Sequence, residues 1–293
     1  VIDVPAYFKW SADGLLGWPA INNNIWLFDV EKDVVTNLLK MPKETIGWTK
    51  LLIKTNANFL DLEIPTSDGK IVILAIDTGA DVGIRLNPQK WREWKSSHPK
   101  QQITLDSYYT PSIGIVVKEE SWSDKISIGQ VVLTDVPIQE ADENDVQLGT
   151  FPDAKYGATL GLAALKRLDI IIDGKHGVAY LRPKETRPLP YEHNRLGAVF
   201  VPKDLQSDDL IAHVIVGSPA YEARIRDGDF LLEIGGLDCT KWRTDPNVLP
   251  LSRFWNNPAG TKLELTLRRG DKIFKTTATL RNILPPDSAE NSN

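Results

Sequence analysis

Asp77, Thr78 and Gly79 form the segment of this sequence whose residue types are best suited to chemistry. Residues 71–76 carry no charge and are mostly β-branched or aliphatic, which predicts a buried strand that ends at Asp77. Gly79 permits backbone conformations and close approaches that a Cβ would block, so we expect a sharp turn after the strand. A carboxylate on such a turn can act as a general acid or base, although Asp and Gly also form turns without a catalytic role.

Four further segments follow this turn in a regular order. They are a glycine-containing apolar run, a strand pair, an apolar segment leading into a helix and a buried strand, at residues 112–117, 125–133, 158–165 and 170–173. In this order and spacing, residues 48–183 resemble the lobe of a retropepsin-like aspartic peptidase. The resemblance implies a mainly β, acid-protease barrel lobe over residues 46–183, in which residues 101–117 form a flap hairpin.

The resemblance also implies the roles of particular residues. Asp77 would be a catalytic acid, Thr78 would brace the turn with its hydroxyl, and Gly79 would let amides approach the carboxylate. The flap would contact the substrate through Tyr108, Tyr109 and Gly114. Such enzymes hydrolyse peptide bonds with a water activated between two carboxylates that share one proton, and neither a metal nor a cofactor is implied.

The chain contains a single Asp-Thr-Gly, so the second acid must come from elsewhere. One source is an identical lobe in a homodimer, another is a missing first lobe, and a third reading is a degenerate lobe in a non-catalytic peptide-binding or scaffold protein. An internal repeat favours the missing lobe over the homodimer, because residues 16–21 and 25–29 parallel residues 160–165 and 169–173 at one offset of 144. We therefore predict that residues 1–45 are the end of a preceding lobe. The alternative for the repeat is chance similarity of short apolar motifs.

A charged, proline-rich linker at residues 184–190 separates a second module. Residues 191–284 resemble a PDZ domain, through the Gly-Ser-Pro-Ala run at 217–220 and the Gly-Asp-Phe-Leu-Leu-Glu-Ile run at 228–234. The resemblance implies a groove for an extended peptide with a free C-terminus, between a receiving strand at 199–201 and a helix at 245–255. The implied carboxylate-binding loop and side-chain pocket consist of Arg195, Leu196, Gly197, Ala198, Leu251 and Phe254. The alternative is a groove closed by its own chain in a module that only braces the first lobe.

Composition excludes several other classes of protein. A net charge of −5 without a basic, aromatic-interleaved stretch argues against nucleic-acid binding. The single cysteine allows no internal disulfide, the four histidines lack metal-ligand spacing, and no run is long enough to span a membrane. We therefore expect an extracytoplasmic (periplasmic or secreted) aspartic endopeptidase with a peptide substrate, a C-terminal PDZ domain, and a disordered tail at 285–293.

Overall fold

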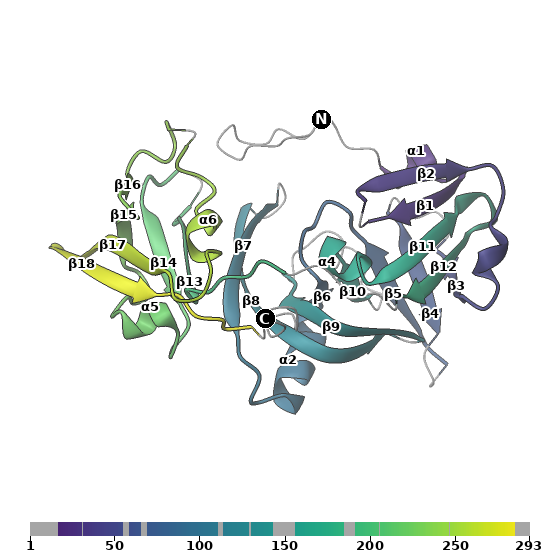
Figure 1. Ribbon diagram of the computed structural model, residues 1–293, viewed down its shortest axis with the longest axis horizontal. Helices are drawn as coiled ribbons and strands as arrows, with labels where there is room; N and C mark the ends of the chain where they lie inside the picture. Colours follow the sequence, from purple (N-terminus) through teal and green to yellow (C-terminus); the bar gives the residue numbers. More distant parts are fainter. Residues whose placement is uncertain are drawn as a thin grey trace. The chain divides into compact units, whose positions relative to one another are not determined.

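The computed structural model describes residues 17–30, 32–54, 59–65, 69–110, 114–128, 130–142, 156–184, 191–204, 206–245 and 247–284 (Figure 1). The described chain divides into two compact units. The N-terminal unit holds the residues up to 99 and residues 122–191, and the C-terminal unit holds residues 100–121 and those from 192 onward. The predicted linker and tail fall mostly or wholly outside the described residues, as do residues 1–16.

The N-terminal unit is built on one sheet. In order of pairing, its strands are β2 (Val34–Leu38), β1 (Ile25–Asp29), β11 (Leu168–Asp173), β12 (Val178–Pro183), β3 (Thr49–Ile53), β4 (Asp61–Pro65), β5 (Ile71–Ile76), β10 (Tyr156–Leu160), β6 (Ile84–Leu86), β9 (Val131–Glu140) and β8 (Gly114–Ile128). The pairs β5–β10 and β6–β9 are parallel. The predictions of a mainly β fold and of a buried strand before Asp77 are therefore confirmed. The predicted barrel does not close among the described strands, because the path of pairing ends at β2 and does not return to it.

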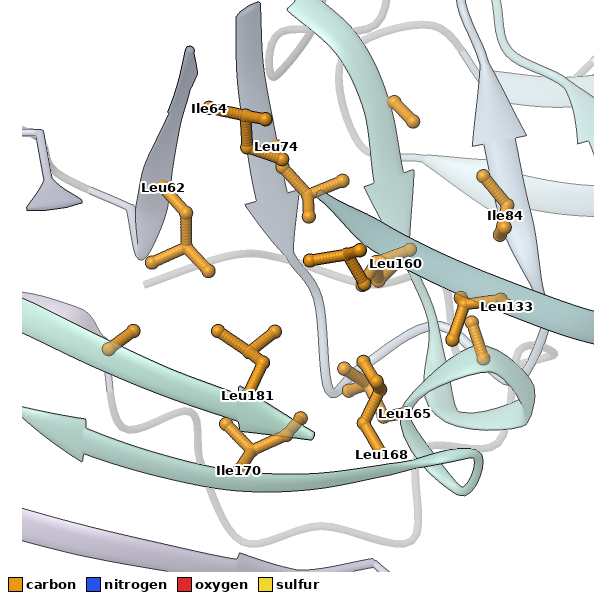
Figure 2. Packing of buried hydrophobic residues seen from close by; sticks show 14 of the residues in the cluster. Leu62, Ile64, Leu74, Ile84, Leu133, Leu160, Leu165, Leu168, Ile170 and Leu181 are labelled. Atoms are coloured by element: carbon orange, nitrogen blue, oxygen red, sulfur yellow. The ribbon is translucent and has the colours of Figure 1, made fainter. Parts of the chain in front are cut away.

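Aliphatic side chains from opposite parts of this sheet form the core of the N-terminal unit. Figure 2 shows Leu74 of β5 and Leu160 of β10 on one side, with Ile170 of β11 and Leu181 of β12 on the other. All four side chains are at most 1% exposed. Burying each such side chain contributes about 1.5–3 kcal/mol, so this core stabilises β5, the strand that ends next to Asp77.

Short helices and turns connect the strands. They are α1 (Trp18–Ile21), η1 (Lys43–Thr45), α2 (Pro88–Ser97), α4 (Leu162–Leu165) and η2 (Gly174–His176). A side-chain cap and a proline begin α2, since the Asn87 side chain accepts a hydrogen bond from the Lys90 amide at 2.8 Å and Pro88 occupies the first helical position. The Trp91 and Trp94 side chains on this helix are buried, as expected for residues that serve packing.

The two segments that are 144 residues apart have the same sequence of elements. Helix α1 corresponds to α4, strand β1 to β11 and strand β2 to β12. The turns between the strands also correspond, because Asp33 and Gly177 both have positive φ angles, of 53° and 66°. Strands β1 and β11 pair antiparallel with Leu27 opposite Ile171, which are equivalent positions. The two segments therefore pair with each other about a local, approximate two-fold axis, while the origin of residues 1–45 in a preceding lobe stays a prediction.

The C-terminal unit contains a second sheet and a hairpin. The sheet runs β13 (Ala198–Pro202), β14 (Leu210–Val214), β15 (Phe230–Ile234), β17 (Lys262–Arg269) and β18 (Lys272–Thr279), with β16 (Leu237–Asp238) paired to β15. The helices are α5 (Pro219–Glu222) and α6 (Ser252–Trp255). The hairpin consists of β7 (Thr104–Thr110) and the first half of β8, up to residue 121. The receiving strand predicted at 199–201 lies within β13.

The predicted helix at residues 245–255 is limited to its last turn, α6. The Asp245 side chain accepts a hydrogen bond from the Asn247 amide at 2.9 Å, which stabilises a turn in place of a helix. Pro250 has no amide hydrogen to donate within a helix. A helix therefore begins only at Ser252, after both residues.

Cys239 should not react with a thiol reagent in the folded protein. Its side chain is 0% exposed, and burial raises the pKa of the thiol to about 12. The reactive thiolate is therefore scarce at pH 8, where a free cysteine reacts readily. We expect less than one tenth of the chains to be labelled by Ellman's reagent within an hour at pH 8, and complete labelling in denaturant. Fast labelling of the native protein would contradict the buried position.

Candidate functional site

The turn after β5 fixes the position of the Asp77 carboxylate. The Asp77 amide donates to the Leu160 carbonyl at 2.9 Å, which ties the end of β5 to the end of β10. The Gly79 amide then donates to Asp77 Oδ1 at 2.9 Å and orients the side chain. Asp77 is half-buried, whereas Thr78 and Gly79 are exposed. The turn thus presents one oriented carboxylate at the surface of the N-terminal unit.

The loop after this turn is held against the start of α4. The Leu162 amide donates to the Ala80 carbonyl at 2.7 Å, and the Ala163 amide donates to the Val82 carbonyl at 3.0 Å. A Cβ on Gly161 would lie 2.4 Å from the Val82 oxygen, so the close approach requires glycine at that position. Because Gly161 has no side chain, the loop after Asp77 can pack directly against the backbone at the start of α4.

A catalytic pair needs two carboxylates within hydrogen-bonding reach, and this turn supplies one. Among the described residues, the Asp77 carboxylate accepts a hydrogen bond only from Gly79, and the Thr78 hydroxyl makes none. The bracing contact expected of Thr78 is therefore absent from the described part of the chain.

The predicted flap residues lie in the other unit. Tyr108 and Tyr109 are on β7, and Gly114, with a φ of 92°, begins β8. One face of this hairpin packs into the hydrophobic core of the C-terminal unit through Leu105, Ile115 and Val117. Asp77 belongs to the N-terminal unit, so the structure does not bring the predicted flap and the predicted acid together in one compact unit.

The predicted carboxylate-binding loop has two amides that converge on one oxygen. The amides of Leu196 and Gly197 donate to Asn194 Oδ1 at 2.9 and 3.0 Å. Gly197 has a φ of 67°, and Ser218 Cβ lies 2.3 Å from the position that a Cβ on this glycine would take. Both the backbone conformation and the lack of space therefore require glycine here. Convergent amides of this kind favour an anionic oxygen.

Arg195 and Ala198, the other members of this loop, have internal partners. Arg195 Nε donates to Asn282 Oδ1 at 2.8 Å, and its guanidinium also donates to the Asn256 carbonyl at 2.7 Å. Ala198 is the first residue of β13, and its carbonyl accepts from Asn194 Nδ2 at 2.9 Å. Arg195 thereby connects the loop to the end of α6 and to the chain after β18.

The sequence analysis did not identify Asn194, which organises this region. Its side chain is 4% exposed, and Nδ2 donates both to the Ala198 carbonyl and to the Leu105 carbonyl at 2.9 Å. Its own carbonyl accepts from the Thr104 hydroxyl at 2.8 Å. One asparagine thus joins the loop, strand β13 and the hairpin. An asparagine three residues before Gly197 is a turn signal that sequence alone offered.

The two predicted pocket residues are both part of the core of the C-terminal unit. Leu251 is 3% exposed and precedes α6. Phe254 is half-buried, and its ring edge lies 2.9 Å from the position of a Cβ on Gly235. The aromatic residue of α6 that packs against Phe200 of β13 is Trp255, and the two ring centroids are 6.3 Å apart.

The residues that the structure describes contain neither a metal site nor a membrane-spanning helix. No group of three or more His, Cys, Asp or Glu side chains there is placed to hold a metal ion. None of the helices there is long and apolar enough to cross a membrane. The extracytoplasmic location stays a prediction.

No protein-family model and no curated protein matches the chain. Among solved structures, the chain is similar to the HtrA-type protease AlgW with tripeptide, at 14% identity over 90% of this chain and 94% of that chain, with a TM-score of 0.27. It is also similar to AlgW with decapeptide, at 14% identity over 86% and 85%, with a TM-score of 0.25. A third structure is the serine endoprotease from Yersinia pestis, at 12% identity over 88% and 92%, with a TM-score of 0.24.

This comparison corrects the predicted family and activity. The structures found are HtrA-type and serine proteases, so neither the identification as a retropepsin-like aspartic peptidase nor the predicted aspartic endopeptidase activity is retained. The single oriented carboxylate of Asp77 is consistent with this correction. A homodimer or a missing first lobe is no longer needed to supply a second acid. The TM-scores are too low to establish a common fold, so no serine-protease chemistry is assigned to this chain either.

Proposed function

We propose that this chain is a peptide-binding protein whose C-terminal unit is a PDZ-like module. The module binds an extended peptide in the groove beside β13, with the peptide's terminal carboxylate at the loop formed by residues 195–198. The observation that carries the proposal is the convergence of the Leu196 and Gly197 amides on a single acceptor oxygen. A peptide carboxylate presents the same acceptor with a full negative charge, and charge-assisted hydrogen bonds are roughly twice as strong as neutral ones.

The position of this loop in the sheet supports the proposal. It leads directly into β13, which is an edge strand among the described strands because β14 is its one pairing partner there. An edge strand can accept a further strand through its free backbone groups, and PDZ domains bind peptides in this way. Gly197 and Ser218 pack closely at the start of β13, which holds the loop amides in a fixed orientation.

Peptide titration tests this function on the whole chain. The probe is a fluorescent pool of decapeptides, randomised except for a C-terminal Val, Leu or Phe, made once with a free carboxylate and once as the amide. We expect saturable binding of the free-acid pool and at least tenfold weaker binding of the amidated pool, measured by fluorescence polarisation. The expected ratio corresponds to the loss of about 1.4 kcal/mol from one charge-assisted contact.

A variant of the loop separates this site from unspecific binding. Gly197→Ala places a methyl group against Ser218 and should abolish the preference for the free acid. Gly260→Ala is the matched control, because that glycine also has a positive φ but no atom within 4 Å of its Cβ position. Equal binding of both pools, or no binding of either, would overturn the proposed function.

A further inference from the structure

We propose that the hairpin β7–β8 is the resident occupant of the groove beside β13, and that a peptide ligand binds by displacing it. The inference rests on the proposed function and adds its regulation: the chain competes with its own ligand. It also names a ligand class, because a peptide that replaces the hairpin must offer an extended segment with apolar side chains at alternate positions.

Burial of β13 shows that its groove is already covered. Strands with one free edge commonly leave one face partly exposed, yet the first four residues of β13 are at most 7% exposed on both faces. Within the unit, β7 lies beside β13. Leu105, at 7% exposure, belongs to the same buried cluster as Val199 and Val201. The hairpin therefore supplies the apolar cover that a ligand would otherwise supply.

Apolar side chains occupy alternate positions along the hairpin, as they would along an extended peptide ligand. Ser107 pairs with Val117 and Tyr109 with Ile115, so the two aliphatic residues of β8 share the face that carries Leu105. Val117 and Ile115 are partly buried against the core of the C-terminal unit. Lys118 pairs with Asp106 on the opposite face of the hairpin. The face that carries Leu105 therefore packs in the core of the C-terminal unit, while the opposite face carries Asp106 and Lys118 next to the buried Val116.

Asn194 couples the hairpin to the carboxylate loop. Its Oδ1 occupies the point where the Leu196 and Gly197 amides converge, and its Nδ2 binds the Leu105 carbonyl of β7. A peptide carboxylate can take this point only if the Asn194 side chain moves away. Movement of Asn194 breaks its hydrogen bond to the Leu105 carbonyl of β7. Binding of a peptide carboxylate to the loop therefore requires release of the hairpin. The side chain is too buried to leave while the hairpin stays in place.

Weakening the hairpin contact should therefore strengthen ligand binding. A docked hairpin lowers the apparent affinity in proportion to the fraction of chains whose groove is open. Val117→Lys puts a charge on the docked face, and we expect the free-acid decapeptide pool to bind about tenfold more tightly. Lys118→Ala changes the opposite face of the same strand and is the control, for which we expect unchanged affinity. Both variants are tested in the whole chain.

Hydrogen exchange provides a second measurement that needs no variant. Saturating the unaltered chain with the free-acid pool should speed amide exchange in residues 104–110 and 114–117 while slowing it in residues 197–202. Two results would overturn the inference and leave the proposed function in place. One is equal peptide affinity of the unaltered chain and Val117→Lys. The other is peptide binding without faster amide exchange in the hairpin. Absence of binding in every form would instead overturn the proposed function. If Val117→Lys fails to fold, the exchange result on the unaltered chain decides.

Discussion

Replacing Asn194 with leucine should lower the free energy of unfolding of the C-terminal unit by about 4 kcal/mol. Leucine has the same number and branching of side-chain heavy atoms as asparagine and a somewhat larger volume, so the change removes the polar groups without opening a cavity. It leaves the amides of Leu196 and Gly197 buried without an acceptor, and the Leu105 and Ala198 carbonyls lose a donor. Each buried group left unpaired costs about 1–3 kcal/mol. Urea unfolding followed by tryptophan fluorescence measures the loss.

Asn257→Leu is the matched control for this change. Asn257 is exposed, and its side chain donates one hydrogen bond, to the Phe254 carbonyl at 3.1 Å. Exposed substitutions of this kind usually change stability by less than about 0.5 kcal/mol. Losses of similar size in both variants would show that Asn194 does not organise the loop and the hairpin.

Gly161→Ala should destabilise the N-terminal unit by about 3 kcal/mol. The added methyl group would lie 2.4 Å from the Val82 oxygen and 2.9 Å from the Ala80 oxygen, and both are backbone atoms that cannot rotate away. The backbone must shift, which strains the hydrogen bonds that Leu162 and Ala163 donate to this loop. Overpacking of this kind costs about 1–3 kcal/mol, and occasionally more. Thermal unfolding monitored by circular dichroism measures the effect.

The internal repeat supplies the control for this second change. Gly17 is the position equivalent to Gly161, and both precede a one-turn helix with the backbone extended. A Cβ on Gly17 would meet only Pro19 Cδ, at 3.7 Å, which is an ordinary van der Waals contact. We expect Gly17→Ala to be nearly neutral. A neutral Gly161→Ala would show that the loop after Asp77 is not held by α4 in the way described.

Local sequence signals predicted local structure well. The uncharged run before Asp77 is strand β5, and Asn87-Pro88 begins α2 with the expected side-chain cap. Both depend on residues that are close in sequence, for which hydrophobic pattern and capping chemistry are informative. The offset between the repeated segments was also visible from the sequence, because helix and strand patterns survive in short windows.

Long-range packing was not predictable from the same signals. The sequence predicts residues 101–117 as a flap over Asp77, yet the apolar face of this hairpin packs in the core of the C-terminal unit. Alternation shows that one face of a hairpin is buried, but it does not say against which partner. The role of Asn194 was missed for a similar reason, since one of its partners, Leu105, is 89 residues away. The family resemblance depended on the order of common elements and was corrected by the comparison with solved structures.

The pairing of β1 with β11 has a consequence for how the chain is made. Leu27 meets its partner Ile171 only after the ribosome has added 144 more residues. At about 5–20 residues per second, that takes roughly 7–30 s. During this interval the nascent chain carries strand β1, with the apolar side chains of Trp26 and Phe28, without the partner strand β11. Newly synthesised chains should therefore be most open to chaperones and to aggregation through this N-terminal strand pair, and that exposure should end once β11 has left the ribosome.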